Sequence, residues 1–135
     1  MANTTDAAYG QFVTATDTVK QVATTTPLAM GESETEAEVR KYFSDVPVLV
    51  QVARCESSFR HTLADGSILR GKVDSRDIGV MQINTFYHGA EAAELGLDLT
   101  KFEDNMKFAR ILYEKEGTKP WNSSAACWSR SLASL

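Results

Sequence analysis

The pattern of hydrophobic and polar positions divides the chain into two parts. Residues 1–32 are rich in threonine, contain Lys20 as their single basic residue and show no sustained hydrophobic period, so we interpret them as an arm or linker. Periodic apolar positions begin at Ser33. We therefore expect residues 33–135 to form one domain.

Two consecutive helices are predicted at the start of this domain. Ser33-Glu34-Thr35-Glu36 has the form of a capping box and predicts a helix that ends near Phe43. Asp45 is expected to cap a second helix, which tolerates Pro47 in its first turn. Its apolar residues follow helical spacing: Val48, Leu49, Val52 and Cys55. Glu56 then falls at the end of a buried helix.

The helical pattern breaks between residues 57 and 77. Asp65-Gly66 and Arg70-Gly71 are turn signals, and residues 67–69 and 72–73 are expected to form the short strands of a hairpin. The sequence therefore predicts a small β-region between helical segments.

Two further helices are predicted after this hairpin. Residues 87–95 precede Gly96, and residues 102–116 precede Gly117, in agreement with the preference for glycine just after a helix. The longer helix carries an apolar stripe typical of a core-facing surface: Phe102, Met106, Ala109 and Tyr113. The predicted fold class is α+β, predominantly helical with a small hairpin.

Composition and charge exclude several classes of protein. The 135 residues are 43% hydrophobic and 24% charged, with a net charge of −4, which argues against disorder and against a nucleic-acid partner. The apolar run 46–50 is far shorter than the roughly 20 residues of a membrane span. His61 and His88 stand alone in the sequence, and no Gly-rich phosphate loop is present, so we expect no metal and no cofactor.

The two cysteines leave two interpretations open. Cys55 and Cys127 either form one disulfide that closes a long loop or remain two buried thiols. The first residues show neither the basic segment nor the apolar segment of an export signal. A mature chain whose signal has been removed stays equally open.

The candidate chemistry rests on two carboxylates, Glu56 and Asp77. A carboxylic acid at the end of a buried helix loses hydration, which raises its pKa, whereas a carboxylate in polar surroundings stays ionised. Such a pair is suited to cleaving glycosidic bonds. The alternative is a structural one, in which Glu56 pairs with Arg54 or Arg60, and Asp77 pairs with Arg76.

Two motifs in order resemble the lysozyme superfamily. They are Glu56-Ser57-Ser58-Phe59 and, 21 residues after Glu56, the segment that begins at Asp77 and reads Asp-Ile-Gly-Val-Met-Gln-Ile-Asn. The second motif is similar to the corresponding run of chicken-type lysozymes and to the Gly-x-Met-Gln-Ile core of soluble lytic transglycosylases. The resemblance extends from about residue 46 to 128 and implies a lysozyme-like fold with the hairpin beside an active-site cleft.

The resemblance also implies roles for individual residues. Glu56 takes the role of general acid and base, and Asp77 that of the ionised partner; Gln82 and Asn84 become candidates for binding the sugar. Transglycosylases carry Ala-Tyr-Asn near the end of the domain, where this chain has Ala126-Cys127-Trp128. That alignment brings Cys127 to Cys55, which favours the disulfide and with it an extracytoplasmic location.

The implied function is cleavage of the β-1,4 bond between N-acetylmuramic acid and N-acetylglucosamine in peptidoglycan. A lytic transglycosylase that leaves 1,6-anhydro ends is the first interpretation, a lysozyme-type hydrolase the second, and a non-catalytic glycan-binding module the third. We expect a monomer whose partner is the glycan strand.

Several neighbouring residues receive a prediction of their own. Trp128 is expected in the core, whereas Trp121 suits either the core or stacking on a sugar. A basic cluster is expected on the hairpin beside the cleft: Arg70, Lys72 and Arg76.

Overall fold

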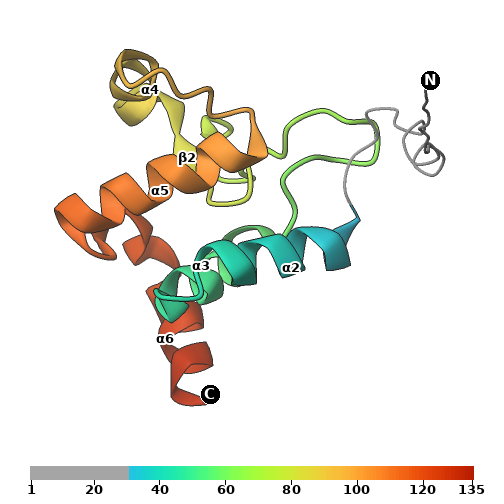
Figure 1. The fold of residues 1–135 in the computed structure, drawn as a ribbon, viewed down its shortest axis with the longest axis vertical. Helices are drawn as coiled ribbons and strands as arrows, with labels where there is room; N and C mark the ends of the chain where they lie inside the picture. Colours follow the sequence, from blue (N-terminus) through green and yellow to red (C-terminus); the bar gives the residue numbers. More distant parts are fainter. Residues whose placement is uncertain (1–30) are drawn as a thin grey trace, which may run out of the picture.

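The computed structural model describes residues 31–135, which fold into helices around a very small sheet (Figure 1). Residues 1–30 of the predicted arm lie outside the described residues. The elements are α2 (Glu32–Tyr42), α3 (Pro47–Ser57), β1 (Asp77–Ile78), β2 (Ile83–Asn84), α4 (Thr85–Glu94), α5 (Phe102–Glu116), the 3₁₀ helix η1 (Lys119–Ser124) and α6 (Ala125–Ala133). This confirms the α+β class at a coarse level, mostly helical with one small antiparallel sheet.

The first two helices form where the sequence predicts them, but both N-terminal caps were predicted wrongly. Helix α2 begins at Glu32, and Glu34, not Glu36, accepts a hydrogen bond from the Gly31 amide at 3.2 Å. Helix α3 has Val46 at its N-cap position, without a side-chain cap. Asp45 instead forms an ion pair with Arg110 of α5 at 2.9 Å, so a long-range partner replaces the predicted local one.

The β-region was predicted at the wrong residues. The sheet pairs β1 with β2 in antiparallel register, with Asp77 opposite Asn84. Ile68 and Arg70 form isolated bridges with Thr62 and Ile78, whereas residues 72–73 form no strand. Residues 67–69, which were predicted to form a strand, therefore lie in a loop that contacts its surroundings through the bridge of Ile68. The two strands, β1 and β2, belong instead to residues 77–84, the second of the two motifs that resemble lysozymes.

Helices α4 and α5 form close to where the sequence predicts them, and one further helix, α6, forms at the C-terminus. Helix α5 spans the predicted residues, and α4 begins two residues earlier than predicted because Asn84 caps it. Helix α6 was not predicted, and none of its residues is buried. It packs against α3, and Figure 1 shows it extending away from the other helices to the C-terminus.

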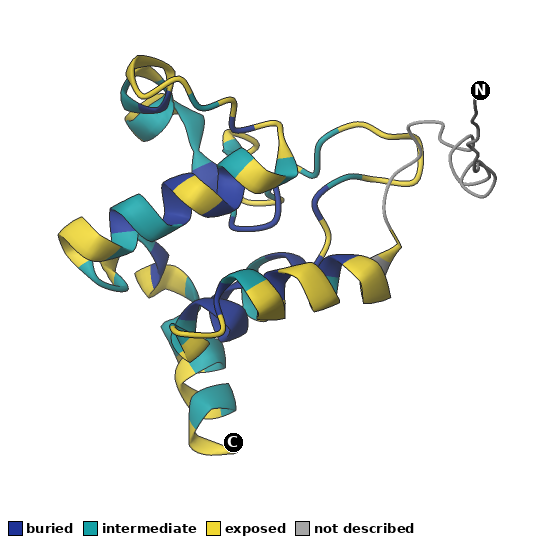
Figure 2. Ribbon diagram, in the orientation of Figure 1, coloured by how far each residue is buried: buried dark blue, intermediate teal, exposed yellow. Residues whose placement is uncertain are grey.

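The hydrophobic core lies between α3, α5 and the β-region, where the buried segments in Figure 2 face one another. Of the predicted stripe on α5, Met106 and Ala109 are buried, whereas Phe102 and Tyr113 are partly buried and pack against the core. Trp121 is 2% exposed and its indole nitrogen donates to the Met81 carbonyl at 2.9 Å. Trp128, predicted to be core, packs only partly buried against it.

Asn105, a fully buried residue of α5, fixes the turn between β1 and β2. Its side-chain oxygen accepts from the Met81 amide at 2.9 Å, and its amide nitrogen donates to the Ile78 and Leu99 carbonyls. Gly79 has a φ of 78° and leaves no room for a Cβ beside Asn105 and His61. The turn after Asp77 is therefore held by the core rather than by the sheet alone.

Candidate active site

Two adjoining hollows form a groove across the molecule. The first has a volume of about 250 Å³ and is lined on its outer side by Tyr87, His88 and Pro120. The second, of about 350 Å³, is lined on its outer side by the loop that contains Arg70, Lys72 and Val73, and by Ser58 and Arg60. Both hollows share one set of lining residues: Glu56, Asp77, Gln82 and Ser123.

Glu56 stands in the last turn of α3, where the helix meets the groove. Its carboxyl group is partly buried and accepts a hydrogen bond from the Ser124 hydroxyl at 2.6 Å. Loss of hydration raises the pKa of Glu56, the negative charge of Asp77 raises it further, and the Ser124 hydrogen bond acts in the opposite direction. Burial is the largest of these influences, so the carboxyl group is biased toward its protonated form.

The segment that carries Ser124 is joined covalently to α3. A disulfide links Cys55, the residue before Glu56, to Cys127 of α6, which confirms the pairing that the resemblance implies. The Trp121 carbonyl, at 3.2 Å, is a second possible acceptor for the single Ser124 hydroxyl proton, and the Trp128 indole donates to the same carbonyl at 3.0 Å. The Ser124 hydroxyl group therefore lies within hydrogen-bond distance of both the Glu56 carboxyl group and the Trp121 carbonyl.

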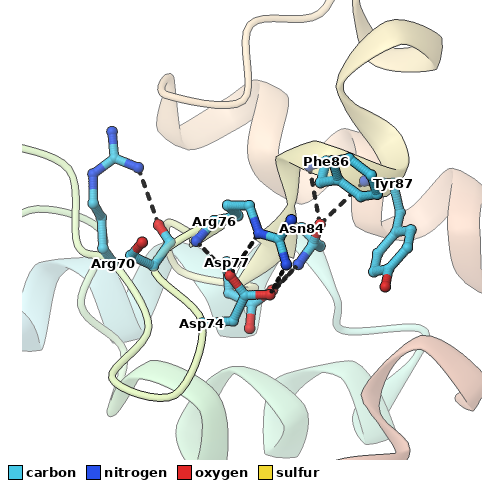
Figure 3. Close-up of polar contacts among 8 residues, drawn as sticks. Arg70, Asp74, Arg76, Asp77, Asn84, Phe86 and Tyr87 are labelled. Atoms are coloured by element: carbon cyan, nitrogen blue, oxygen red, sulfur yellow. Dashed lines mark hydrogen bonds and ion pairs between the residues drawn. The ribbon is translucent and has the colours of Figure 1, made fainter.

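Asp77 of β1 faces the same groove and is oriented by Asn84 of β2. The Asn84 amide nitrogen donates to Asp77 at 2.8 Å and to Asp74 at 3.1 Å (Figure 3). The predicted alternative, an ion pair between Asp77 and Arg76, is not the arrangement found, because Arg76 forms its ion pair with Asp74 at 2.9 Å. That interaction lowers the pKa of Asp74 well below its ordinary range and leaves Asp77 facing the groove.

The two predicted sugar-binding residues both line the first hollow, but they differ in how their polar atoms are used. The Asn84 oxygen caps α4 by accepting from the Phe86 and Tyr87 amides, so both ends of this side chain have partners within the protein. Gln82 donates to the Gly79 carbonyl at 3.0 Å and lies partly exposed in both hollows. Asn84 is therefore better placed to position Asp77, and Gln82 to contact a ligand.

Sequence reasoning missed the main hydrogen-bond partner of Glu56, Ser124, which lines neither hollow itself. The motif comparison pointed to Ala126-Cys127-Trp128, but the hydroxyl that reaches Glu56 comes from two residues before that motif. Trp121 is both a core residue and part of the wall of the first hollow. The sequence predicts Trp121 either in the core or at the sugar, whereas no local signal marks Ser124, because η1 brings it beside Glu56 by a turn that the sequence pattern did not predict.

The described residues contain no cluster of three histidine, cysteine, aspartate or glutamate side chains suited to holding a metal ion. Within the same range no helix is long and apolar enough to cross a bilayer. No protein-family model, curated protein or solved structure matched the chain. The chemistry of the groove must therefore be argued from its own residues.

Proposed function

We propose that the protein is a peptidoglycan-cleaving muramidase with a lysozyme-like fold, which acts as a lytic transglycosylase on the β-1,4 bond between N-acetylmuramic acid and N-acetylglucosamine. One observation carries the proposal: a partly buried carboxyl group with a raised pKa stands at the junction of two hollows, opposite a second carboxylate. In this proposal a chain of sugars lies along both hollows and brings a glycosidic oxygen to Glu56. The family-like motifs around Glu56 and Asp77 support the same assignment.

The proposed reaction begins with the proton held by Glu56. Glu56 gives this proton to the glycosidic oxygen as the bond to the muramoyl C1 breaks, and the charge of Asp77 stabilises the positive charge that develops on the sugar ring. The Glu56 carboxylate then removes the proton of the muramoyl C6 hydroxyl, whose oxygen bonds to C1. The products are a free 4-hydroxyl on one sugar and a 1,6-anhydro ring on the other.

A lysozyme-type hydrolase is the second candidate, and the position of Asp77 favours it. Many lytic transglycosylases lack a second carboxylate, whereas here Asn84 holds Asp77 in place at the groove. In this reaction the intermediate is attacked by water, and the muramoyl residue is left with a reducing end. The two candidates share every step up to cleavage of the glycosidic bond.

Digestion of purified peptidoglycan followed by mass spectrometry of the released muropeptides tests both candidates. We expect anhydro-muropeptides, each lighter by one water molecule than the product of hydrolysis. Products with reducing ends instead assign the hydrolase. If glycan is bound but no muropeptide is released under any condition tested, the protein is a non-catalytic glycan-binding module and the proposal is wrong.

The disulfide supports an extracytoplasmic site of action, since disulfides persist mainly in oxidising compartments. Peptidoglycan lies outside the cytoplasmic membrane, so the proposed substrate and the redox state of Cys55 and Cys127 agree. We propose that the protein acts there as a monomer.

Replacement of Ser124 by alanine is expected to shift the pH dependence of cleavage. The Ser124 hydroxyl lowers the pKa of Glu56 by hydrogen bonding to its carboxylate, so its removal raises that pKa. A general acid must be protonated, and the rate therefore falls as the pH rises through the pKa of Glu56. In a pH–rate profile the alkaline limb of Ser124→Ala should lie at higher pH than that of the wild type.

Ser123→Ala is the matched control, because Ser123 is an exposed neighbour that lines both hollows. Its alkaline limb should coincide with that of the wild type. A Ser124→Ala protein that is merely slower, with both limbs unmoved, would show that Ser124 does not tune Glu56.

A further inference from the structure

The two hollows of the groove differ in charge. The second hollow is lined by three cationic side chains, from Arg60, Arg70 and Lys72. Among the described residues that line the first hollow there is no lysine or arginine, and its outer wall is formed by Tyr87, His88 and Pro120. The carboxylates of Glu56 and Asp77 are shared by both hollows, so the difference in charge comes from the outer walls.

The cationic wall contains two members of the predicted basic cluster, Arg70 and Lys72, but not the third, Arg76. Arg76 does not line the second hollow. Its guanidinium forms an ion pair with Asp74 and lies over the Phe86 ring, 4.8 Å from the ring centre. Arg60 joins it from the end of α3, where its side chain donates to the Ser57 carbonyl at 3.1 Å. The wall is therefore assembled from two segments, one just after α3 and the other in the loop that contains residues 70–72.

Two of these cations are available to a ligand. Arg70 is exposed and uses one guanidinium nitrogen to donate to the Ser75 carbonyl at 3.1 Å, and Figure 3 shows its guanidinium turned away from the Asp74–Asn84 cluster. Lys72 is exposed, and within residues 31–135 its ammonium group has no ion pair or hydrogen bond. Guanidinium and ammonium groups at one end of a groove are suited to binding a carboxylate.

We infer that the second hollow binds a carboxylate of the muramoyl residue, so that the protein prefers acidic glycan strands over neutral chitin-like strands. This inference rests on the proposed function, because it names the substrate class of the same groove. The carboxylate has two possible sources, which are the lactyl group of a peptide-free muramoyl residue and the peptide stem that otherwise substitutes it. A neutral N-acetylglucosamine oligomer has neither and gains nothing from Arg70 or Lys72.

The inference is tested by binding to protein that carries Glu56→Gln, which prevents turnover of the ligand. Three probes are compared by titration calorimetry at low salt: a N-acetylglucosaminyl-N-acetylmuramoyl disaccharide with a tetrapeptide stem, its peptide-free form and the neutral N-acetylglucosamine tetramer. Arg70→Gln and Lys72→Gln are each expected to weaken binding of an acidic probe about fivefold, the effect of one exposed ion pair. Binding of the neutral tetramer should be unchanged. The acidic probe whose binding these substitutions weaken identifies the source of the carboxylate.

Lys107→Gln is the matched control, because Lys107 is exposed on α5 and lines neither hollow. If Arg70→Gln disturbs the conformation of its own loop, Lys72→Gln still tests the inference, because the Lys72 side chain makes no contact that holds the loop. Equal losses for acidic and neutral probes, or no loss for either, would overturn the inference. Failure of the proposed function is a separate result, seen as wild-type protein that releases no muropeptides.

Discussion

Glu56→Gln is expected to reduce the rate of peptidoglycan cleavage by about 10² to 10⁴-fold, the range that a general acid contributes. Glutamine keeps the size of the side chain and still accepts the hydrogen bond of Ser124, but it has no proton to give to the leaving oxygen. The measurement is the initial rate of muropeptide release at fixed enzyme concentration. Binding of the glycan should persist in the variant, because the walls of the groove are unchanged.

Glu114→Gln serves as the control for this substitution, since Glu114 is exposed on α5 and lines neither hollow. It should cleave at the wild-type rate. A Glu56→Gln protein that keeps more than half of the wild-type rate would remove Glu56 from the mechanism.

The stability of the same variant should depend on pH in a defined direction. Because the pKa of Glu56 is raised in the folded state, its contribution to folding is complete below the pKa of the unfolded chain. That contribution is lost as the pH rises through the folded-state pKa. Glutamine does not titrate, so the melting temperature of Glu56→Gln relative to wild type should rise over the same interval. A melting temperature of Glu56→Gln at or above that of the wild type at the assay pH would show that its loss of activity is not a loss of folding.

Removal of the disulfide is expected to lower the free energy of unfolding by about 4 kcal/mol in the chain-entropy model, because Cys55 and Cys127 are 72 residues apart. For a domain of this size the melting temperature should fall by roughly 15–30 °C. Helix α6 depends strongly on this bond, since it has no buried residue and its other ties to α3 include a 3.2 Å hydrogen bond from Arg54 to Ser131. The measurement is thermal unfolding of the Cys55→Ser/Cys127→Ser protein.

Oxidised and reduced wild-type protein provide the matched comparison, because they differ only in the bond itself. The reduced protein should melt close to the double variant. Hydrogen exchange should show that α6 loses protection first, and with it the support of Ser124 beside Glu56. A melting temperature within a few degrees of the oxidised protein would show that packing of α6 on α3 suffices without the bond.

The sequence predicted the helices with long apolar periods well, because burial of one face determines them. Helix α5 has the predicted bounds, and its stripe reaches the core. The cap of α3 was missed because a tertiary partner competes for the same side chain: Asp45 binds Arg110, 65 residues away, instead of capping the helix. A local reading of the sequence cannot anticipate such a partner. The cap of α2 was missed because that helix begins at Glu32, before the predicted cap Ser33.

The candidate site was predictable only in part. Glu56 and Asp77 were singled out from local environment and from the family-like motifs, and the fold brings both to one groove. Ser124 was missed because no helix was predicted after residue 116, so nothing in the sequence showed that η1 and α6 bring this hydroxyl group back to Glu56. The predicted hairpin strands at residues 67–69 and 72–73 do not pair with each other; Ile68 and Arg70 instead bridge to Thr62 and Ile78.

The central claim is that burial keeps a proton on Glu56 while it faces a sugar-binding groove, and an NMR titration of its side-chain carboxyl carbon tests this most directly. The resonance is assigned by its absence from the spectrum of Glu56→Gln. The account predicts a midpoint above the ordinary value of a glutamate. A midpoint at or below the ordinary value would contradict the account, because the carboxyl group would then hold no proton for the glycosidic oxygen.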